Sequence, residues 1–169
     1  GGSHNTIQIN AYESTIGGGS YNVIQTDSRD ATIGGGSNNE IQTNAYYSTI
    51  AGGSQNTIQT NAHESTIGGG FFNAIQTDSR EATIGGGSNN EIQTNAYRST
   101  IGGGHNNAIQ TNAHSSTIGG GYQNNANGLF SAIGAQWGRL DILVHSLAFA
   151  PREALAGRVT DCPRDGFLT

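Results

Sequence analysis

Glycine triplets recur at a fixed spacing over about the first 121 residues, as in Gly17-Gly18-Gly19. Glycine-rich loops are a common way of binding phosphate, because backbone amides can approach the anion closely. A phosphate-binding loop also needs Gly-Lys-Ser/Thr after its glycines, and the chain contains no lysine. We therefore expect these glycines to allow tight backbone turns and not to bind a nucleotide.

Metal chemistry is equally poorly supported by the candidate ligands. Calcium-binding β-roll repeats place an aspartate just after their glycines, whereas here that place holds Ser, Phe, His, Asn or Tyr. His63 and His114 occupy the same place in repeats that are three units apart, about 14 Å if each unit rises by one strand spacing. Cys162 is the single cysteine. The sequence therefore predicts no catalytic, cofactor-binding or metal-binding residue, and it predicts that the chain is not an enzyme.

Asparagine and threonine each recur at the same fixed spacing as the glycines, and each column has a structural and a functional interpretation. A column of asparagines can bind a ligand, or its amides can bond to one another along a stack. We expect the second arrangement. A threonine column can form an ice-binding face, although familiar ice-binding solenoids resemble a Thr-x-Thr ladder and this unit offers one outward threonine. The two columns are Asn5, Asn22, Asn39, Asn56, Asn73, Asn90, Asn107 and Asn124, and Thr15, Thr32, Thr49, Thr66, Thr83, Thr100 and Thr117.

The element that positions these side chains is a strict 17-residue repeat, and such a short period is typical of a solenoid. Within a unit, Ile16 and Ile24 lie eight residues apart, and Ile33 opens the next unit nine residues later. This spacing predicts two short strands per coil, joined by the glycine turn and by a second turn. We predict an all-β chain, a parallel β-solenoid (β-helix or β-roll) of about seven coils and roughly 34 Å, with a short α/β C-terminal tail.

Period-two alternation sorts the strand positions into inward and outward columns. If Ile24 points inward, Asn22 and Thr26 also point inward, while Val23 and Gln25 point outward. The Val23 column contains two glutamates, which would not be stacked in so thin an interior. On the other strand we expect Ser14 and Ile16 inward and Thr15 outward. The variable positions fall on the turns, where they form either a recognition surface or solvated loop tips.

Composition limits the partners of the chain. The formal net charge is −5, and all of it falls in the repeats. An acidic array without a basic patch predicts no nucleic-acid partner and no anionic-membrane partner. We find no apolar run of membrane-spanning length, so we expect no membrane insertion, and no signal peptide is visible. Because residue 1 already lies inside a repeat, the chain has the pattern of a processed or truncated product.

The chain changes character near Gly128. Residues 1–128 contain no Leu, Pro, Trp or Cys, and all of these occur in residues 129–169. Apolar spacing from Leu129 to Trp137 predicts a helix, and Asp141 to His145 reads as a short buried strand. We divide the chain into a repeat array, 1–128, and a C-terminal segment, 129–169. That segment is either a cap, with Phe130, Ile133 and Trp137 covering the last coil, or a fusion scar.

Two resemblances extend this interpretation. The repeat resembles extracellular β-solenoids, namely the heads of trimeric autotransporter adhesins and curli-like fibres, which implies a self-assembling architecture at the cell surface or outside the cell. The stretch from Trp137-Gly138-Arg139-Leu140-Asp141 to Arg158 is similar to the central helix, strand and loop of the NADH-dependent enoyl-acyl-carrier-protein reductases, from about Leu129 to Thr169. In that family, the part matching His145 to Ala150 borders the cofactor. The family's glycine-rich turn and its catalytic Tyr and Lys have no counterpart here.

We therefore expect a non-enzymatic, self-associating structural or adhesive repeat protein, cell-surface or extracellular, without a cofactor. Fourteen column isoleucines make a small apolar core for about 120 residues, and the open ends of a solenoid are unpaired strand edges, so association with further copies is expected. The partner is the chain itself, as a homo-oligomer: a trimer or a filament. A surface ligand is left open. The alternatives are an inactive, truncated or chimeric enoyl-acyl-carrier-protein reductase fragment and an ice-binding solenoid.

Overall fold

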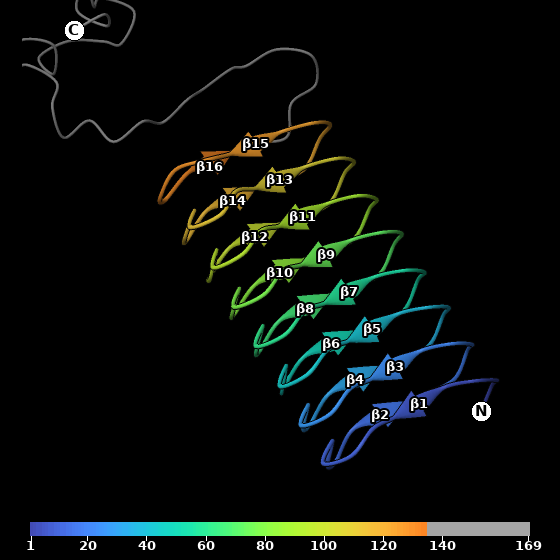
Figure 1. The fold of residues 1–169 in the computed structure, drawn as a ribbon. Helices are drawn as coiled ribbons and strands as arrows, with labels where there is room; N and C mark the ends of the chain where they lie inside the picture. The colour runs from blue at the N-terminus through green and yellow to red at the C-terminus, as the bar shows by residue number, and fades with distance from the viewer. Residues whose placement is uncertain (135–169) are drawn as a thin grey trace, which may run out of the picture.

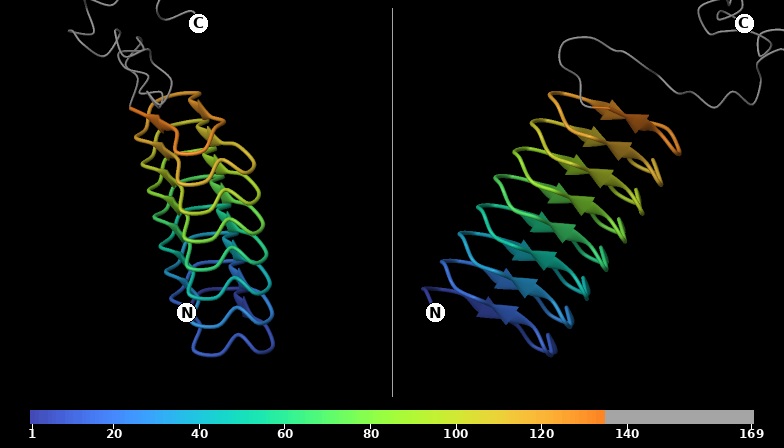
Figure 2. Two further views of the ribbon diagram at one scale, coloured as in Figure 1. Left: turned by 90° about the vertical axis from the view of Figure 1, so that its left-hand side faces the viewer. Right: turned by 180° about the vertical axis from the view of Figure 1, so that it is seen from behind.

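The computed structural model describes residues 1–134, which form a stack of coils around a narrow interior (Figure 1). Each coil contributes one two-residue strand to each of two sheets, and residues 1–134 contain no helix. Figure 2 shows the same coils from the side and from behind, with the turns of successive coils lying in line along the stack. The described part of the chain is therefore a parallel β-solenoid, as the repeat predicts.

The two sheets alternate along the chain. The first sheet contains β1 (Thr6–Ile7), β3 (Val23–Ile24), β5 (Glu40–Ile41), β7 (Thr57–Ile58), β9 (Ala74–Ile75), β11 (Glu91–Ile92), β13 (Ala108–Ile109) and β15 (Asn125–Ala126). The second sheet contains β2 (Thr15–Ile16), β4 (Thr32–Ile33), β6 (Thr49–Ile50), β8 (Thr66–Ile67), β10 (Thr83–Ile84), β12 (Thr100–Ile101), β14 (Thr117–Ile118) and β16 (Ala132–Ile133). Every pair of neighbouring strands is parallel, and from β1 to β14 partners in a sheet lie one repeat unit apart, as in Thr49↔Thr66.

The expected number of coils was too small, because each sheet has eight strands and the stack therefore has eight coils. In the last coil, Thr117 pairs with Ala132, two positions earlier than the repeat requires, and Ala126 stands where the other coils carry isoleucine. This two-residue deletion and the missing isoleucine hide the eighth coil from a search for a strict period. The eighth coil ends with β16, so the repeat geometry continues past Gly128.

The helix predicted from Leu129 is wrong for the described residues, because β16 occupies Ala132–Ile133 and pairs with β14. Ile133 packs against the core of the stack, as expected of a cap, but Phe130 is 77% exposed and covers nothing. Trp137 and the predicted strand from Asp141 to His145 lie outside the described residues. The division at residues 128 and 129 therefore stays a prediction.

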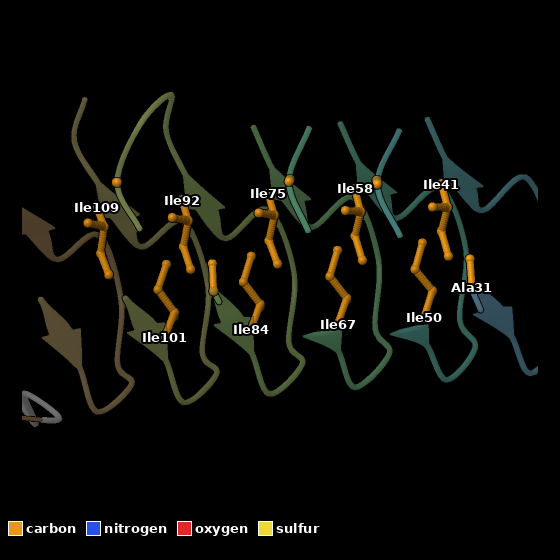
Figure 3. Close-up of a cluster of buried hydrophobic side chains, with 14 of the residues drawn as sticks. Ala31, Ile41, Ile50, Ile58, Ile67, Ile75, Ile84, Ile92, Ile101 and Ile109 are labelled. Carbon is orange, nitrogen blue, oxygen red and sulfur yellow. The ribbon is translucent and has the colours of Figure 1, made fainter. Parts of the chain in front are cut away.

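The core consists of two facing isoleucine columns, one from each sheet. Figure 3 shows Ile41, Ile58 and Ile75 from the first sheet pointing toward Ile50 and Ile67 from the second. All twelve isoleucines from Ile24 to Ile118 are fully buried, with 0% of their surface exposed. This confirms the inward columns and accounts for the regular shape of the stack, since every coil meets the same side chains above and below.

The asparagine column bonds along the axis, as predicted, and also holds the glycine turns. Asn56 Nδ2 donates to Asn39 Oδ1 at 3.1 Å, to Gly52 O at 3.0 Å and to Gly70 O at 3.0 Å. Its Oδ1 accepts from the backbone amide and from Nδ2 of Asn73, each at 3.1 Å. A buried amide is thus bonded to its own coil and to both neighbours, which offsets the cost of burying it.

A second polar column follows a rule that the period alone does not reveal. At the two inward positions of the second turn, each of the seven full repeats carries one serine and one alanine, in either order: Ala11/Ser14, Ser28/Ala31, Ala45/Ser48, Ala62/Ser65, Ser79/Ala82, Ala96/Ser99 and Ala113/Ser116. Whichever position it takes, the hydroxyl donates to a carbonyl of the next coil and accepts an amide from it. Ser65 Oγ donates to Ser79 O at 3.0 Å and accepts from Ala82 N at 3.2 Å.

We predict that Ser65→Ala lowers the free energy of unfolding by about 2 kcal/mol, because the buried Ala82 amide loses its hydroxyl partner. The double variant Ala62→Ser/Ser65→Ala recreates the order seen in the coil of Ser79 and Ala82, where the hydroxyl donates to Gln93 O and accepts from Ala96 N. It should restore part of that loss through the equivalent bonds, although the Ala82 amide stays without its hydroxyl partner. Urea unfolding followed by circular dichroism measures both. A double variant no more stable than the single one would contradict the one-hydroxyl rule.

The glutamine column lies outward, as expected, and its side chains bond along the stack. Gln25 is half-buried, and its Nε2 donates to Oε1 of Glu40, a residue of the outward Val23 column. Gln25 Oε1 accepts from the backbone amide of Thr43 at 3.2 Å and from its hydroxyl at 3.1 Å. The Thr26 column, expected inward, is accordingly half-buried or, at Thr111, exposed. The reason is that a side chain long enough to reach the next coil bonds there and leaves less of itself to solvent.

Candidate functional site

The second turn of each coil, which joins the first sheet to the second, carries most of the chain's variable side chains. We call it the outer turn, residues 42–48 in one coil. Two positions in it have positive φ, as at Asn44 (59°) and Tyr47 (56°). Their amides donate to carbonyls of the preceding coil: Asn44 N to Thr26 O at 3.1 Å, and Tyr47 N to Arg29 O at 2.9 Å. The tips are thus part of the backbone ladder, which fixes the side chains that they present.

A hollow lies over two successive outer turns. It is lined by Asp27, Arg29, Asn44, Tyr46 and Tyr47, and its volume is about 330 Å³. The Tyr46 and Tyr47 rings stand perpendicular to each other, with centroids 5.6 Å apart and an interplanar angle of 89°. The hollow therefore places two aromatic rings beside a carboxylate, a guanidinium and an amide.

Each histidine of the outer-turn column stacks on the tyrosine of the coil before it. The Tyr46 and His63 rings are 3.8 Å apart at 13°, and the Tyr97 and His114 rings are 3.8 Å apart at 18°. His63 is only 8% exposed, and the Nδ1 atoms of His63 and His114 are buried without a hydrogen-bond partner in residues 1–134. These stacks fix the ring of Tyr46, and therefore one wall of the hollow.

Burial lowers the pKa of His63 below its ordinary value of 6.5, and the nearby positive charge of Arg80 lowers it further. The Asn44 backbone, Glu64 and Asp78 oppose this shift without reversing it. The folded chain thus binds the His63 proton less tightly than the unfolded chain. As the pH falls below 6.5, protons bind preferentially to the unfolded state, and folding loses stability.

We therefore predict that acidification lowers the melting temperature more in the wild type than in His63→Phe, which keeps a ring against Tyr46 without a titrating nitrogen. Thermal unfolding between about pH 7.5 and pH 5.5 checks this. Titration of carboxylates affects both proteins alike, so a difference between their melting-temperature profiles arises from His63. Equal pH profiles for the two proteins would contradict the assignment.

The glycine turn carries a second, less enclosed set of aromatic side chains. Phe71 and Phe72 pack edge to face with centroids 4.4 Å apart, and they are 46% and 47% exposed. Tyr21 stacks on His4 at 4.6 Å, and Tyr122 stacks on His105 at 5.4 Å. These pairs lie at different heights along the stack, so they do not form one continuous apolar patch.

The structure separates the histidines that were weighed as metal ligands. His63 and His114 belong to different coils, and each packs against a different tyrosine. In residues 1–134, no three His, Cys, Asp or Glu residues lie close enough together to hold a metal ion. A search of the same residues finds no helix with the length and apolar character needed to span a membrane. The outer-turn hollow is the arrangement that we take as the candidate site.

Sequence reasoning placed the outer-turn residues outside but did not find the hollow or the tyrosine–histidine stacks. The stacks could have been predicted from one column of the aligned repeats, because Tyr46 precedes His63 and Tyr97 precedes His114 by one repeat unit. In a parallel stack such neighbours lie one strand spacing apart, which allows rings to pack face to face. The Glu81–Arg98 ion pair, 3.1 Å in length, follows from the same spacing.

Comparison with known proteins finds relatives for the C-terminal part of the chain. Residues 121–169 match the family described as Enoyl-(Acyl carrier protein) reductase. The chain is 46% identical over 41 residues to the NADH enoyl-[acyl-carrier-protein] reductase FabI of Synechocystis sp., and 52% identical over 40 residues to FabI of Nostoc sp.. Each match covers 24% of this chain. FabI of Aquifex aeolicus is 58% identical over 31 residues, 18% of this chain.

Each match covers a small part of this chain and a small part of the related protein. The matched part spans 16% of the Synechocystis and Nostoc proteins and 12% of the Aquifex protein. Within the described residues, the reductase-like segment begins in the last coil, at residues 121–134, and the remainder lies outside them. The chain therefore joins a β-solenoid to a short enoyl-acyl-carrier-protein reductase-like segment.

Proposed function

We propose that this chain is a non-enzymatic structural or adhesive rod that associates with further copies of itself, outside the cell or on its surface. One observation carries the structural part. The inward side chains of the full coils serve to join one coil to the next: isoleucines by packing, asparagines and serines by bonds along the axis. The extracellular location rests on the likeness of the repeat to extracellular solenoids.

Self-association is supported by the outer surface of the second sheet. Its strands carry an outward threonine column, exposed at Thr15, Thr66 and Thr117 and half-buried in the other coils, and the next outward position holds glycine in every full coil except at Ala51. Neither column contains a charged residue. A flat, uncharged face that repeats at one strand spacing is complementary to a second copy of itself, so two rods can pair along their length.

The test is the mass of the native assembly, measured by analytical ultracentrifugation of the full chain. Thr66→Lys/Thr83→Lys places two charges on this face and should dissociate the assembly, whereas Ala74→Lys places a charge on the opposite sheet and should not. A wild type that is strictly monomeric would overturn the proposal. A trimer would favour the adhesin-like form, and open-ended polymers would favour the fibre form.

A second candidate is a truncated or chimeric reductase fragment without activity, and the match of residues 121–169 favours it. The segment that borders the cofactor in that family would then retain some affinity for NADH. Fluorescence titration of the purified chain with NADH tests this directly. Saturable binding would support the fragment interpretation, and no detectable binding would exclude it.

A third candidate is ice binding, for which the regular threonine column is the relevant feature. Thermal hysteresis of the wild type, absent in Thr66→Lys/Thr83→Lys, would support it. A wild-type solution that freezes at its melting point would exclude it. The double variant Thr66→Lys/Thr83→Lys therefore tests self-association by the native mass and ice binding by thermal hysteresis.

A further inference from the structure

The outer-turn hollow is open to solvent on one side, and its walls combine two aromatic rings with polar groups. Its volume of about 330 Å³ lies at the lower end of the usual range for small-ligand sites, ~300–1,000 Å³. Tyr46 and Tyr47 form two walls at right angles, and Asp27, Arg29 and Asn44 form the rest. The ligand that it fits must present both apolar faces and polar edges.

One of the two rings is held in place before any ligand arrives, because Tyr46 stacks on the buried His63 ring at 3.8 Å. At Tyr47 the backbone is fixed, since its amide donates to Arg29 O at 2.9 Å, and the ring stands edge-on to Tyr46 with 61% of the residue exposed. The fixed Tyr46 ring binds a ligand with little further loss of conformational freedom.

The polar groups of the hollow are available to a ligand. Within residues 1–134 the ion pair that forms is Glu81–Arg98, so Asp27 and Arg29 keep their charges for other partners. Asn44 donates through Nδ2 to Asn61 Oδ1 at 2.8 Å, which leaves its carbonyl oxygen as an acceptor. Among the residues that line the hollow, one carboxylate and one guanidinium cancel in charge, and the carboxylates of Asp30 and Glu64 occupy the position of Tyr47 in the coils before and after it, which disfavours an anionic ligand.

The geometry points to a neutral saccharide as the ligand of this hollow. A pyranose ring has an apolar C–H face that packs on an aromatic ring, and hydroxyls at its edge that both donate and accept. Arg29 donates to such hydroxyls and Asp27 accepts from them, and hydrogen bonds to charged groups are the stronger ones. The inference rests on the adhesive part of the proposed function and gives it a ligand class.

The chain contains its own comparison site, three coils further on. Asp78, Arg80, Asn95 and Tyr97 repeat the types of Asp27, Arg29, Asn44 and Tyr46, and Tyr97 also stacks on a histidine, His114. The second wall is different, because Arg98 replaces Tyr47 and bonds to Glu81 at 3.1 Å. The copy thus keeps the polar groups and one ring, and it lacks the ring that completes the hollow.

This duplication supplies two matched variants. Tyr47→Arg converts the first site into the second, and Arg98→Tyr converts the second into the first. Both residues already occur at this position of the same turn, with φ of 56° in each case, so both variants should fold. We expect Tyr47→Arg to weaken saccharide binding at least tenfold, and Arg98→Tyr to raise the number of sites per chain from one to two.

Saturation-transfer difference NMR on the full chain measures the binding. The probes are D-glucose, D-galactose, D-mannose, N-acetyl-D-glucosamine and their disaccharides, with N-acetylneuraminic acid as an anionic comparison. Signal on the ring C–H groups of a neutral probe, lost in Tyr47→Arg, supports the site. Absence of binding to every neutral probe, binding of the anionic probe alone, or binding that Tyr47→Arg leaves unchanged would overturn it.

Native mass is measured on the same samples, so the two proposals can fail separately. A rod that assembles but binds no saccharide overturns the ligand site and leaves the self-association proposal standing. A monomer that binds saccharide through Tyr47 overturns self-association and leaves the ligand site standing. Circular dichroism of Tyr47→Arg confirms that any loss of binding does not come from unfolding.

Discussion

Asn73→Ala should lower the free energy of unfolding by about 3–6 kcal/mol, which would make it among the most damaging single substitutions in the array. The Asn73 side chain donates to Asn56 Oδ1 at 3.1 Å, to Gly69 O at 3.0 Å and to Gly87 O at 3.0 Å. It also accepts from the amide of Asn90 at 3.0 Å. Alanine would leave several of these buried groups without a partner. Urea unfolding followed by circular dichroism gives the loss.

Two comparison variants separate hydrogen bonding from shape and from backbone conformation. Asn73→Asp keeps the volume but replaces donors by acceptors that face two carbonyls, so it should also destabilise at neutral pH. Asn106→Gly removes an exposed asparagine with φ of 56°, a conformation that glycine adopts readily, so it should be nearly neutral. A loss below about 1 kcal/mol for Asn73→Ala would contradict the role assigned to this column.

Gly53→Ala and Gly52→Ala should differ sharply, although the two glycines are adjacent. A Cβ on Gly53 would lie 2.2 Å from Gly70 O in the next coil, and Gly53 has φ of 86°. A Cβ on Gly52 would meet no atom within 4 Å. We expect Gly53→Ala to cost about 3 kcal/mol or more through clash and strain, and Gly52→Ala to change stability by less than about 1 kcal/mol.

Thermal and urea unfolding of the two variants, measured side by side, check this prediction. The natural alanine at position 51 already shows that the first place of a triplet accepts a Cβ. The three glycines therefore have different roles despite their identical appearance: the first and the third lie against a carbonyl of the next coil, as at Gly68 and Gly70, whereas the second, as at Gly52, is open. Similar losses for both variants would mean that the triplet acts only through chain flexibility.

Much of the interior could be derived from the sequence, because two periods overlap there. The 17-residue repeat stacks like residues on like, and alternation along each strand places Ile and Asn inside and Thr15 and its equivalents outside. The inward columns are confirmed by the complete burial of Ile58 and Asn56. The asparagine ladder follows from the same geometry, since amides one strand spacing apart can bond.

What escaped prediction depended on departures from the period or on side-chain reach. The eighth coil was missed because two residues are deleted and Ala126 replaces isoleucine. The inward assignment of the Thr26 column failed because these residues lie where the first sheet ends, and the Thr43 hydroxyl donates to the half-buried Gln25 instead of entering the interior. The hollow at Tyr46 and Tyr47 depends on ring orientations at a turn, which no repeat pattern determines.

The proposals use the two surfaces that the interior does not need. The uncharged threonine and glycine face is assigned to pairing with further copies, and the outer turns are assigned to a ligand. Residues 26–47 and 77–98 differ only at Asp30/Glu81 and Tyr47/Arg98, and the exchange of Tyr47 for Arg98 makes the two turns chemically different. In this account, the repeat supplies a rigid frame on which single turn residues vary without affecting the stack.

Hydrogen exchange of the asparagine side-chain amides, followed by NMR on the full chain, tests the central claim most directly. Asn39, Asn56, Asn73 and Asn90 are fully buried, and the Nδ2 group of each donates to carbonyl oxygens of its own coil and of the next. We expect their Nδ2 protons to exchange at least a hundredfold more slowly than those of the exposed Asn89 and Asn106. Equal, rapid exchange at all of these asparagines would contradict the stacked, bonded coil on which every other conclusion rests.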